Sequence, residues 1–256
     1  MTNDVLVSKS DRVLRIVLNR PDKKNALTSA MYDTMREAIA TSNDDRDVRV
    51  LFIHGQPDCF TAGNDLADFQ DIERMRRDRP AMKFLETISS ATKPIVAAVN
   101  GPAVGIGTTI LLSCDLAYAG QSTRFQMPFA SLGLNPEGTS SFALARMAGH
   151  VQAAELLLLG ERFSAEHAKA IGLINAVLPD AELFAHSEAK VAQLAAQPAA
   201  AIRATKALMR RWTAERVKEV LAAESALFSE RLASPEFAEA ARAFFERRKP
   251  DFSGFD

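Results

Sequence analysis

Two turns in the sequence place free backbone N–H groups where a helix is expected to follow a buried strand. Residues 59–66 read Cys-Phe-Thr-Ala-Gly-Asn-Asp-Leu, and residues 100–107 read Asn-Gly-Pro-Ala-Val-Gly-Ile-Gly. The first N–H groups of a helix have no partner within it, and the helix dipole favours negative charge there. If the turns face each other, one N–H from each can hold an oxygen that becomes negative during a reaction, as in an oxyanion hole.

The alternative is two ordinary tight turns in which glycine relieves backbone crowding. A nucleotide-binding role for the second turn is disfavoured. No lysine follows its last glycine, and Ile110 stands where Gly-x-Gly-x-x-Gly requires a third glycine. The histidines are too scattered for a zinc site, and no Gly-x-Ser-x-Gly sequence suggests a hydrolase. We therefore expect neither a metal nor a separate cofactor.

Strands that alternate with helices are expected to position the two turns. Val5–Leu18 predicts a hairpin, and Thr28 or Ser29 can cap a helix. Apolar runs at 48–54, 94–99 and 115–119 predict buried strands, and a short helix is expected around 108–113. This alternation indicates parallel pairing through right-handed crossovers.

The rest of the chain is predicted to be mainly helical. Residues 65–92 indicate helix with a break near Pro80, and the chain from about Val151 is expected to be almost wholly helical, with breaks at Pro198 and Pro235. The final helices could pack on the same core or form an arm on a neighbouring subunit, and the pattern alone leaves both open.

Composition limits the class of protein. The 256 residues are 47% hydrophobic and carry a net charge of -1, so a large core is possible and a nucleic-acid surface is not indicated. No apolar stretch reaches the roughly 20 residues of a membrane helix. Two cysteines suggest reduced thiols. Residues 1–5 do not resemble a secretory signal and residues 253–256 are not the peroxisomal tripeptide, so we expect a cytoplasmic protein.

Several segments together resemble the crotonase superfamily, the enoyl-CoA hydratase/isomerase family, over nearly the whole chain. They are Asn19-Arg20-Pro21 with Asn25-Ala26-Leu27, residues 62–66, 93–101, Cys114-Asp115, residues 163–165 with 170–173, and residues 247–250. The resemblance implies an α/β fold, a crotonase-like spiral of ββα units over residues 1–200. It also implies a C-terminal helical oligomerisation region over residues 201–256, and a homotrimer or a dimer of trimers.

The resemblance also implies an acyl-CoA substrate and a role in fatty-acid metabolism such as β-oxidation. The oxyanion donors would be the N–H groups of Asn64 and Ile106. Ile106 replaces the commoner glycine, which should be tolerated because only its backbone is used. The residues expected to contact coenzyme A are Lys23, Lys24, Ala26, Ala62, Asp65 and Lys249. Asp65 is also expected to cap the following helix.

The reaction implied by the resemblance is isomerisation rather than hydration. The two glutamates of the family's hydratases correspond to Thr109 and Phe129, and neither can exchange protons near neutral pH. Glu137, in a Pro-Glu-Gly sequence, matches the catalytic glutamate of the peroxisomal type of 3,2-enoyl-CoA isomerase. Apolar neighbours, Phe129, Leu132 and Leu134, could raise its pKa, which suits a base that takes a proton and returns it.

Three alternatives remain from the sequence. Glu137 could be a helix-start carboxylate that accepts from backbone N–H groups. Another crotonase-type reaction, hydration included, could use a different carboxylate, with Asp68 and Glu86 as the nearest candidates. The chain could also bind acyl-CoA without catalysis. We expect Phe129, Leu134 and Thr109 to line the acyl pocket, and the segment 67–90 to form its mouth.

Overall fold

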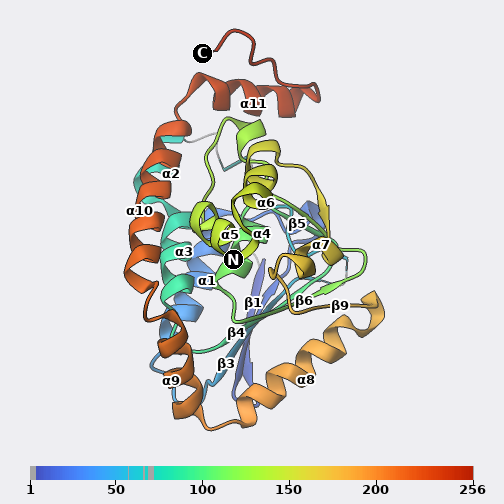
Figure 1. The fold of residues 1–256 in the computed structure, drawn as a ribbon, viewed down its shortest axis with the longest axis vertical. Coiled ribbons are helices and arrows are strands. Elements are labelled where there is room, and N and C mark those ends of the chain that lie inside the picture. The colour runs from blue at the N-terminus through green and yellow to red at the C-terminus, as the bar shows by residue number, and fades with distance from the viewer. Residues whose placement is uncertain (1–3, 57, 66, 69–71, 256) are drawn as a thin grey trace.

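A six-stranded sheet runs through the centre of the protein (Figure 1). The structure, a computed structural model, describes residues 4–56, 58–65, 67–68 and 72–255. The strand order is β1-β2-β3-β4-β6-β9, and every pair is parallel except the β1–β2 hairpin. The predicted hairpin and parallel pairing are therefore confirmed. The strands are β1 (Val5–Ser10), β2 (Val13–Leu18), β3 (Val50–His54), β4 (Ile95–Val99), β6 (Leu116–Gly120) and β9 (Ala176–Leu178).

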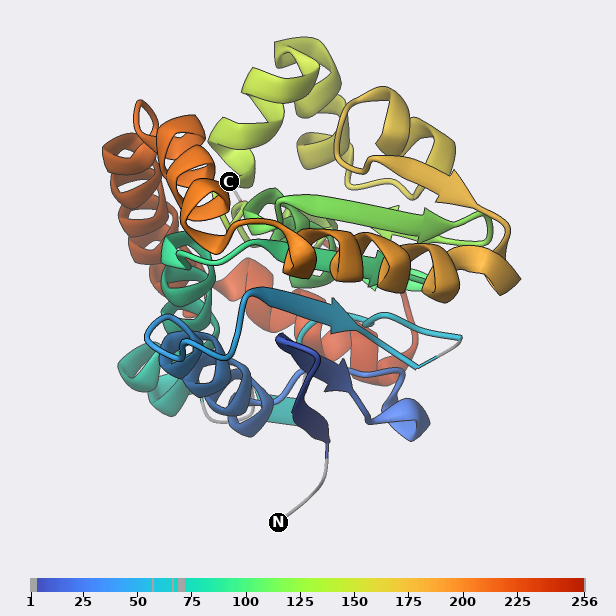
Figure 2. The same ribbon diagram turned by 90° about the horizontal axis from the view of Figure 1, so that it is seen from below.

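Both faces of the sheet are buried at its central strands β3, β4 and β6, which explains why these strands are almost wholly apolar, whereas the edge strand β1 is largely exposed. In β4, Ile95, Ala97 and Val99 join one hydrophobic cluster, whereas Val96 and Ala98 join the other. Successive side chains of a strand point to opposite faces, so a continuous apolar run fits a sheet covered on both sides. The helix α8 (Leu183–Ala196) covers one face and crosses the sheet in Figure 2.

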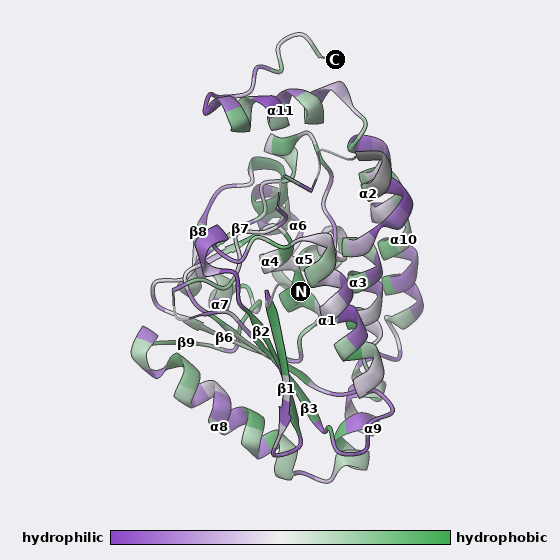
Figure 3. Cartoon of the chain, turned by 180° about the vertical axis from the view of Figure 1, so that it is seen from behind, coloured by the Kyte–Doolittle hydropathy of each residue, from purple (hydrophilic) through white to green (hydrophobic). Residues whose placement is uncertain are grey.

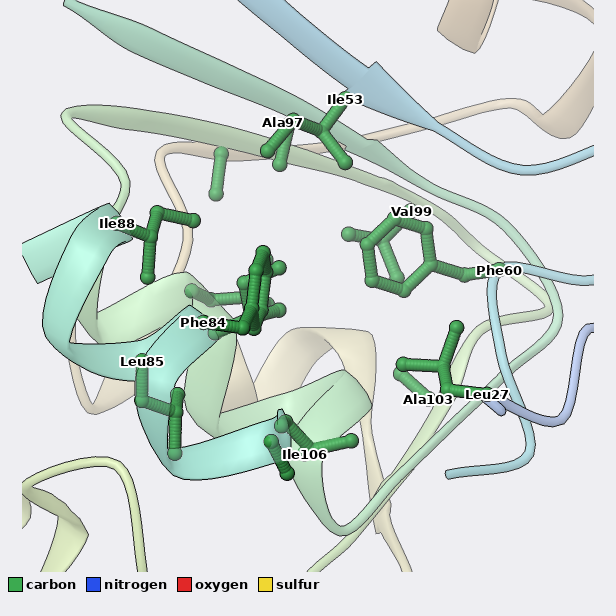
Figure 4. Close-up of a cluster of buried hydrophobic side chains, with 14 of the residues drawn as sticks. Leu27, Ile53, Phe60, Phe84, Leu85, Ile88, Ala97, Val99, Ala103 and Ile106 are labelled. Atoms are coloured by element: carbon green, nitrogen blue, oxygen red, sulfur yellow. The ribbon is translucent and has the colours of Figure 1, made fainter. Parts of the chain in front are cut away.

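Helices α1 (Ser29–Ser42) and α3 (Pro80–Ser90) cover the opposite face. As predicted, the Thr28 side chain caps α1, where it accepts a hydrogen bond from the backbone N–H of Met31. The break near Pro80 is also confirmed, because α2 (Ile72–Asp78) ends just before α3 begins. Figure 4 shows side chains of α3, including Phe84, gathered with side chains of β3 and β4.

A smaller second sheet supplies the inner strand of each repeating unit. It contains β5 (Pro102–Val104), β7 (Arg124–Gln126) and β8 (Phe163–Ser164). Parallel bridges between Leu27 and Asn64 and between Thr61 and Ala103 extend this layer. The chain thus repeats one order of elements: a strand of the large sheet, then a strand or bridge of the small sheet, then a helix. The strands β4 and β5 and the helix α4 (Ile106–Thr109) are one example. This arrangement confirms the expected α/β spiral of ββα units.

The strands β8 and β9 correct the prediction that the chain beyond Val151 is almost wholly helical. Both are very short, and β9 pairs in parallel with β6 at the end of the large sheet. The predicted breaks at Pro198 and Pro235 are confirmed. The later helices and turns are α5 (Ser140–Ala148), α6 (His150–Ala154), a π-helical turn (Glu155–Leu159), α7 (Ala165–Ala170), α9 (Ala199–Arg210), α10 (Ala214–Arg231) and α11 (Pro235–Glu246), and 3-10 turns occupy Pro21–Lys23, Ile110–Ser113, Ala130–Leu132 and Asp180–Glu182.

The helix α10 packs beside α3 on the core of its own chain (Figure 1). Leu221 and Phe228 of this helix are buried in the larger hydrophobic cluster. Figure 3 shows hydrophobic strands at the centre, whereas α8 and α10 carry both hydrophilic and hydrophobic faces. The structure therefore places α10 as a cap on the core. Within the described residues, no helix is both long and apolar enough to cross a membrane.

We predict that Leu183→Ala lowers the free energy of unfolding by about 2–5 kcal/mol, because this fully buried leucine anchors α8 to the sheet and its removal leaves a cavity. The control is Leu227→Ala on α10, whose leucine is 46% exposed. This control should change the free energy by no more than about 0.5 kcal/mol. Guanidinium unfolding at one protein concentration measures both, and equal losses would contradict the assignment of α8 to the core.

Candidate active site

The two turns identified in the sequence are in direct backbone contact. The N–H of Thr61 donates to the carbonyl of Pro102 at 3.1 Å, and the N–H of Val104 donates to the carbonyl of Thr61 at 3.1 Å. Gly63 has φ +92°, and a Cβ there would lie 2.8 Å from the carbonyl oxygen of Val104. Glycine is required at this position because the backbones of the two turns approach so closely.

This contact places two unused N–H groups on neighbouring turns. Within the described residues, the N–H groups of Asn64 and Ile106 have no hydrogen-bond acceptor. Ile106 is the first residue of α4 and follows Gly105, whose φ of +55° and ψ of -117° suit only glycine. The Ile106 side chain lies in the hydrophobic core (Figure 4), so its backbone is the part available to a ligand.

Glu137 lies in the protein interior, and only 1% of the residue is exposed to solvent. Its Oε1 accepts a hydrogen bond from the Thr109 hydroxyl at 2.5 Å. Its Oε2 has no hydrogen-bond partner in the described part of the chain. Thr109 lies about one helical turn after Ile106, so the bond ties Glu137 to the helix that begins with the Ile106 N–H.

Burial raises the pKa of Glu137 to about 8, because the charged form loses its hydration. The Thr109 hydrogen bond acts in the opposite direction and lowers the pKa, whereas the negative charge of Glu224 raises it further. A carboxyl group with this pKa can be converted between its acid and its base near neutral pH. That property is the one required of a group that accepts a proton and then returns it.

Glu137 does not cap the helix α5, so the helix-start alternative is wrong. The carboxylate that performs this role is Glu224 of α10. Its Oε2 accepts from the Thr139 N–H at 2.7 Å, and its Oε1 accepts from the Ser141 N–H at 3.0 Å and the Ser141 hydroxyl at 2.5 Å. Local sequence could not reveal this residue, because it lies more than 80 positions further along the chain.

Tyr32 is a second residue that the sequence analysis missed. Its hydroxyl donates to Oδ1 of Asn64 at 2.5 Å, and its ring is buried against Phe84. Burial raises the pKa of Tyr32 well above its usual range, and the charges of Glu137 and Asp68 act in the same direction. The phenol therefore stays protonated and holds the Asn64 side chain. Its position on the buried face of α1 was the available signal.

Most residues expected to contact coenzyme A lie together. The Arg20 guanidinium donates to the carbonyl of Ala26 at 3.0 Å and to Oδ2 of Asp65 at 2.6 Å. The N–H of Ala62 donates to the carbonyl of Lys24 at 2.9 Å. The expected contacts of this group are Lys23, Lys24, Ala26, Ala62 and Asp65, and both lysine side chains are exposed.

Two further charged residues lie as follows. Asp65 precedes a 3-10 turn at Ala67 and Asp68, and its carboxylate accepts from the Ala67 N–H at 3.0 Å, as expected of a capping residue. The Asp65 carboxylate also pairs with Arg20, and the α-helix α2 begins only at Ile72. Lys249 lies exposed beyond α11, and no contact within the described residues joins it to the group around Lys24.

The residues predicted for the acyl pocket are all buried. Thr109 contacts Glu137, and the ring of Phe129 lies 4.0 Å from the position of a Cβ at Gly105. Leu134 donates its N–H to the carbonyl of Phe129. A narrow cavity beside Asn64 is lined partly by the expected segment 67–90 and partly by residues of α10 and its C-terminal end, which were not predicted from the sequence. Its lining residues are Met75, Arg79, Pro80, Ala81, Met82, Phe228, Ser229 and Leu232.

The two rival carboxylates have other partners. Asp68 accepts hydrogen bonds from both the N–H and the hydroxyl of Ser29 at the start of α1, at 2.7 and 2.8 Å. Glu86 is exposed and pairs with Arg79 at 3.2 Å. Neither Asp68 nor Glu86 is a buried carboxyl group that accepts from Thr109, as Glu137 is. Among the described residues, no cluster of His, Cys, Asp and Glu has the geometry of a metal site.

Fold and site together define a family. Residues 8–255 match the enoyl-CoA hydratase/isomerase family, and the chain belongs to this family. It is 34% identical over 252 residues to enoyl-CoA delta isomerase 2 of Homo sapiens, a match that covers 95% of this chain and 64% of the relative. The chain therefore spans less than two thirds of the length of that relative.

Two further comparisons cover nearly all of both chains. The chain is 31% identical to 2,3-dehydroadipyl-CoA hydratase of Escherichia coli (strain K12), over 98% of this chain and 99% of the relative. It superimposes on the solved structure of OdaA from Pseudomonas aeruginosa with a TM-score of 0.93 and 45% identity, over 96% of this chain and 100% of the other. These relatives place the fold in the crotonase superfamily, and their names include both isomerases and hydratases.

We predict that Glu137→Gln is more stable than the unchanged protein at pH 8 and that the difference disappears at pH 4. The pKa of Glu137 is raised on folding, so the folded state binds more protons than the unfolded state between about pH 4.5 and 8. Stability is therefore lost as pH rises through this window, by up to about 1.4 kcal/mol per pH unit.

Unfolding at several pH values measures the difference, because the subtraction cancels the other titrating groups. The exposed Glu161 supplies the control Glu161→Gln, which should show no such pH-dependent gain. A constant difference between Glu137→Gln and the unchanged protein across the window would contradict the raised pKa of Glu137.

We predict that Thr109→Val raises the pKa of Glu137 still further, because it removes the hydrogen bond that stabilises the carboxylate. Thr109→Ser keeps a hydroxyl and should restore the original titration. The infrared band of the protonated Glu137 carboxyl, assigned by its absence in Glu137→Gln, measures the titration. A lower pKa in the valine variant would be inconsistent with the contact.

Proposed function

We propose that this protein isomerises 3-enoyl-CoA thioesters to 2-enoyl-CoA thioesters. The observation that carries the proposal is the buried Glu137 carboxyl, with one oxygen held by Thr109 and the other without a partner in the described residues. A single base with a pKa near neutrality suffices for this reaction, because the proton removed from one carbon is returned to another.

In the first step, the ionised Glu137 takes a proton from C2 of the substrate through its free Oε2. The C2–H electron pair forms a dienolate whose negative charge is delocalised onto the thioester oxygen. The N–H groups of Asn64 and Ile106 donate to that oxygen. Preorganised donors of this kind contribute several kcal/mol to the stabilisation of such an intermediate, roughly 3–4 for one donor.

In the second step, Glu137 returns the same proton to C4. The dienolate electrons shift to form the C2=C3 bond, and the thioester carbonyl is restored, so no water or cofactor enters the balance. Both steps need the carboxyl to change its protonation state at nearly constant position. The Thr109 hydroxyl serves this purpose, because it can donate to Oε1 while Oε2 gains or loses the proton.

Hydration is the weaker candidate, although relatives named as hydratases match the chain over most of its length. Adding water across a double bond requires one group to activate the water and another to protonate carbon. The positions that resemble the hydratase glutamates hold Thr109 and Phe129. In the structure Thr109 supports Glu137, and Phe129 is a buried apolar ring.

We also propose that the group around Arg20 and Lys24 receives the nucleotide end of coenzyme A. The two exposed lysines, Lys23 and Lys24, can meet phosphate oxygens at the edge of the site, and Ala62 offers its backbone to the adenine. Lys249, from the C-terminal segment, could add a further cation to a phosphate. The site would then extend from this surface to the buried Glu137.

Assembly into a homotrimer or a dimer of trimers is part of the proposal. Large apolar side chains are exposed on α9 and on the π-helical turn, at positions where a monomer would present them to water. An open groove of about 930 Å³ between α5, α9 and α10 adds to this surface. The exposed residues of this surface are Leu158 and Leu159 of the π-helical turn, Leu208 and Met209 of α9, and Trp212 just after α9.

We predict that Glu137→Gln abolishes the appearance of conjugated-thioester absorbance from a 3-enoyl-CoA while acyl-CoA binding is retained. The amide cannot accept the proton, yet it occupies the same volume. In the unchanged protein kcat/KM should rise with pH toward about 8, as Glu137 ionises. Turnover in the variant equal to that of Glu161→Gln would defeat the proposal.

The same absorbance distinguishes the alternatives in the unchanged protein. Incubation with a 2-enoyl-CoA should leave the absorbance unchanged, because Thr109 and Phe129 stand at the positions that resemble the hydratase glutamates. Loss of absorbance would identify a hydratase. No change with either substrate, together with retained acyl-CoA binding, would identify a binding protein.

A further inference from the structure

Glu224 is a buried carboxylate on α10 that the mechanism above does not use. Both of its oxygens accept hydrogen bonds, and every donor belongs to the segment that follows Glu137. The N–H groups of Thr139 and Ser141 can only donate, so they favour the ionised form of Glu224. Burial raises the pKa of Glu224, and these hydrogen bonds oppose the rise.

The segment that Glu224 binds has an unfavourable backbone conformation. Gly138 has φ +67° and Thr139 has φ +68°. Positive φ is readily accepted by glycine but is unfavourable for a β-branched residue such as threonine. The hydrogen bond from the Thr139 N–H to Glu224 offsets part of this cost. The conformation directly after Glu137 is therefore maintained by a residue of α10.

This conformation matters for Glu137 because space around its hydrogen-bond partner is limited. A Cβ at Gly138 would lie 2.9 Å from Oγ1 and 3.0 Å from Cβ of Thr109. A small change in the path of the segment would move it against Thr109 or away from it. The Asn135 side chain adds a second tie, since its Nδ2 donates to the carbonyl of Glu224 at 3.1 Å.

We infer that Glu224 is a positioning residue for the isomerisation, which holds the segment 137–141 so that the Glu137 carboxyl meets Thr109. This inference rests on the proposed function of Glu137. Glu224 touches neither the reacting atoms nor the substrate. It acts through the backbone of Thr139 and Ser141, and it makes the geometry of the catalytic group depend on α10.

The charge of Glu224 gives this role a measurable signature. Among the described residues, the ionisable groups that interact with Glu137 from other elements are Glu224 on α10 and the Tyr32 phenol on α1. The Thr109 hydroxyl of α4 donates a hydrogen bond to Glu137. The pKa of Tyr32 lies well above its usual range, so its phenol stays neutral, whereas the ionised Glu224 carboxylate raises the pKa of Glu137. Removal of this charge should lower the pKa of Glu137, whereas loss of the hydrogen bonds that position the segment 137–141 should lower kcat.

The test compares Glu224→Gln with Glu230→Gln in the full-length protein. Glu230 lies exposed on the same helix, so the control removes the same charge without touching the segment 137–141. In Glu224→Gln we expect the carboxyl titration of Glu137, followed by carbon NMR, to move to lower pH. The acidic limb of kcat/KM should move with it, and the control should leave both unchanged.

Glu224→Ala tests the positioning itself. Because misplacement of a catalytic group by about 1 Å can reduce the rate roughly 100-fold, we expect kcat to fall by about this factor while KM changes by no more than about threefold. If this variant does not fold, Glu224→Gln, which has nearly the same shape, still provides both the titration and kcat.

The outcomes separate the inference from the function on which it rests. A protein that isomerises 3-enoyl-CoA through Glu137, but whose Glu137 titration and kcat are unchanged in Glu224→Gln, overturns the inference alone. A protein that shows no isomerisation overturns the proposed function and the inference together. A shifted titration with reduced kcat, seen in Glu224→Gln and absent from the control, supports both.

Discussion

The proposed active site depends on one carboxyl group, that of Glu137, which is buried away from water and accepts a hydrogen bond from Thr109. A buried charge is strongly unfavourable unless it is paired, so such a group shifts its pKa instead. In the part of the chain that the structure describes, no cation pairs with Glu137, and the Thr109 hydroxyl compensates only part of the lost hydration. This imbalance leaves the acid and the base close in free energy, which is the condition for moving a proton in both directions.

The sheet architecture positions the two backbone N–H groups that are proposed to act together with that carboxyl group. Parallel strands end at the same edge, so the turns after β3 and β4 emerge side by side. Backbone hydrogen bonds between Thr61 and the strand β5 then hold the Asn64 and Ile106 N–H groups on adjacent segments of the chain. The helix α4 that begins at Ile106 also carries Thr109, so one short element links the oxyanion donors to the proposed base.

Conformational strain and unpaired polar atoms are concentrated at this site. Gly105 and Thr139 have positive φ, and the Asn64 N–H, the Ile106 N–H and Glu137 Oε2 lack partners among the described residues. Proteins tolerate such features where the surrounding structure holds them in place, and they recur at functional sites. Here the large hydrophobic core and the α10 carboxylate provide that support.

Local features of the chain could be predicted from sequence, because they depend on neighbouring residues. The hairpin, the Thr28 cap, the breaks at Pro80 and Pro235 and the apolar strands all follow from periodicity and turn chemistry. The resemblance to a family further directed attention to Glu137. Whether that side chain would cap a helix or lie unpaired in the interior was undetermined, since a short motif contains no information on burial.

The tertiary structure decided the features that join distant parts of the chain. The strand β9 pairs with β6 from a position more than 50 residues further along the chain, and Glu224, which caps α5, lies 83 and 85 positions from the residues it binds. Tyr32 became a partner of Asn64 only when α1 packed on the sheet. Hydrogen bonds and desolvation depend on which groups meet in space, and sequence periodicity reports only which face of an element is buried.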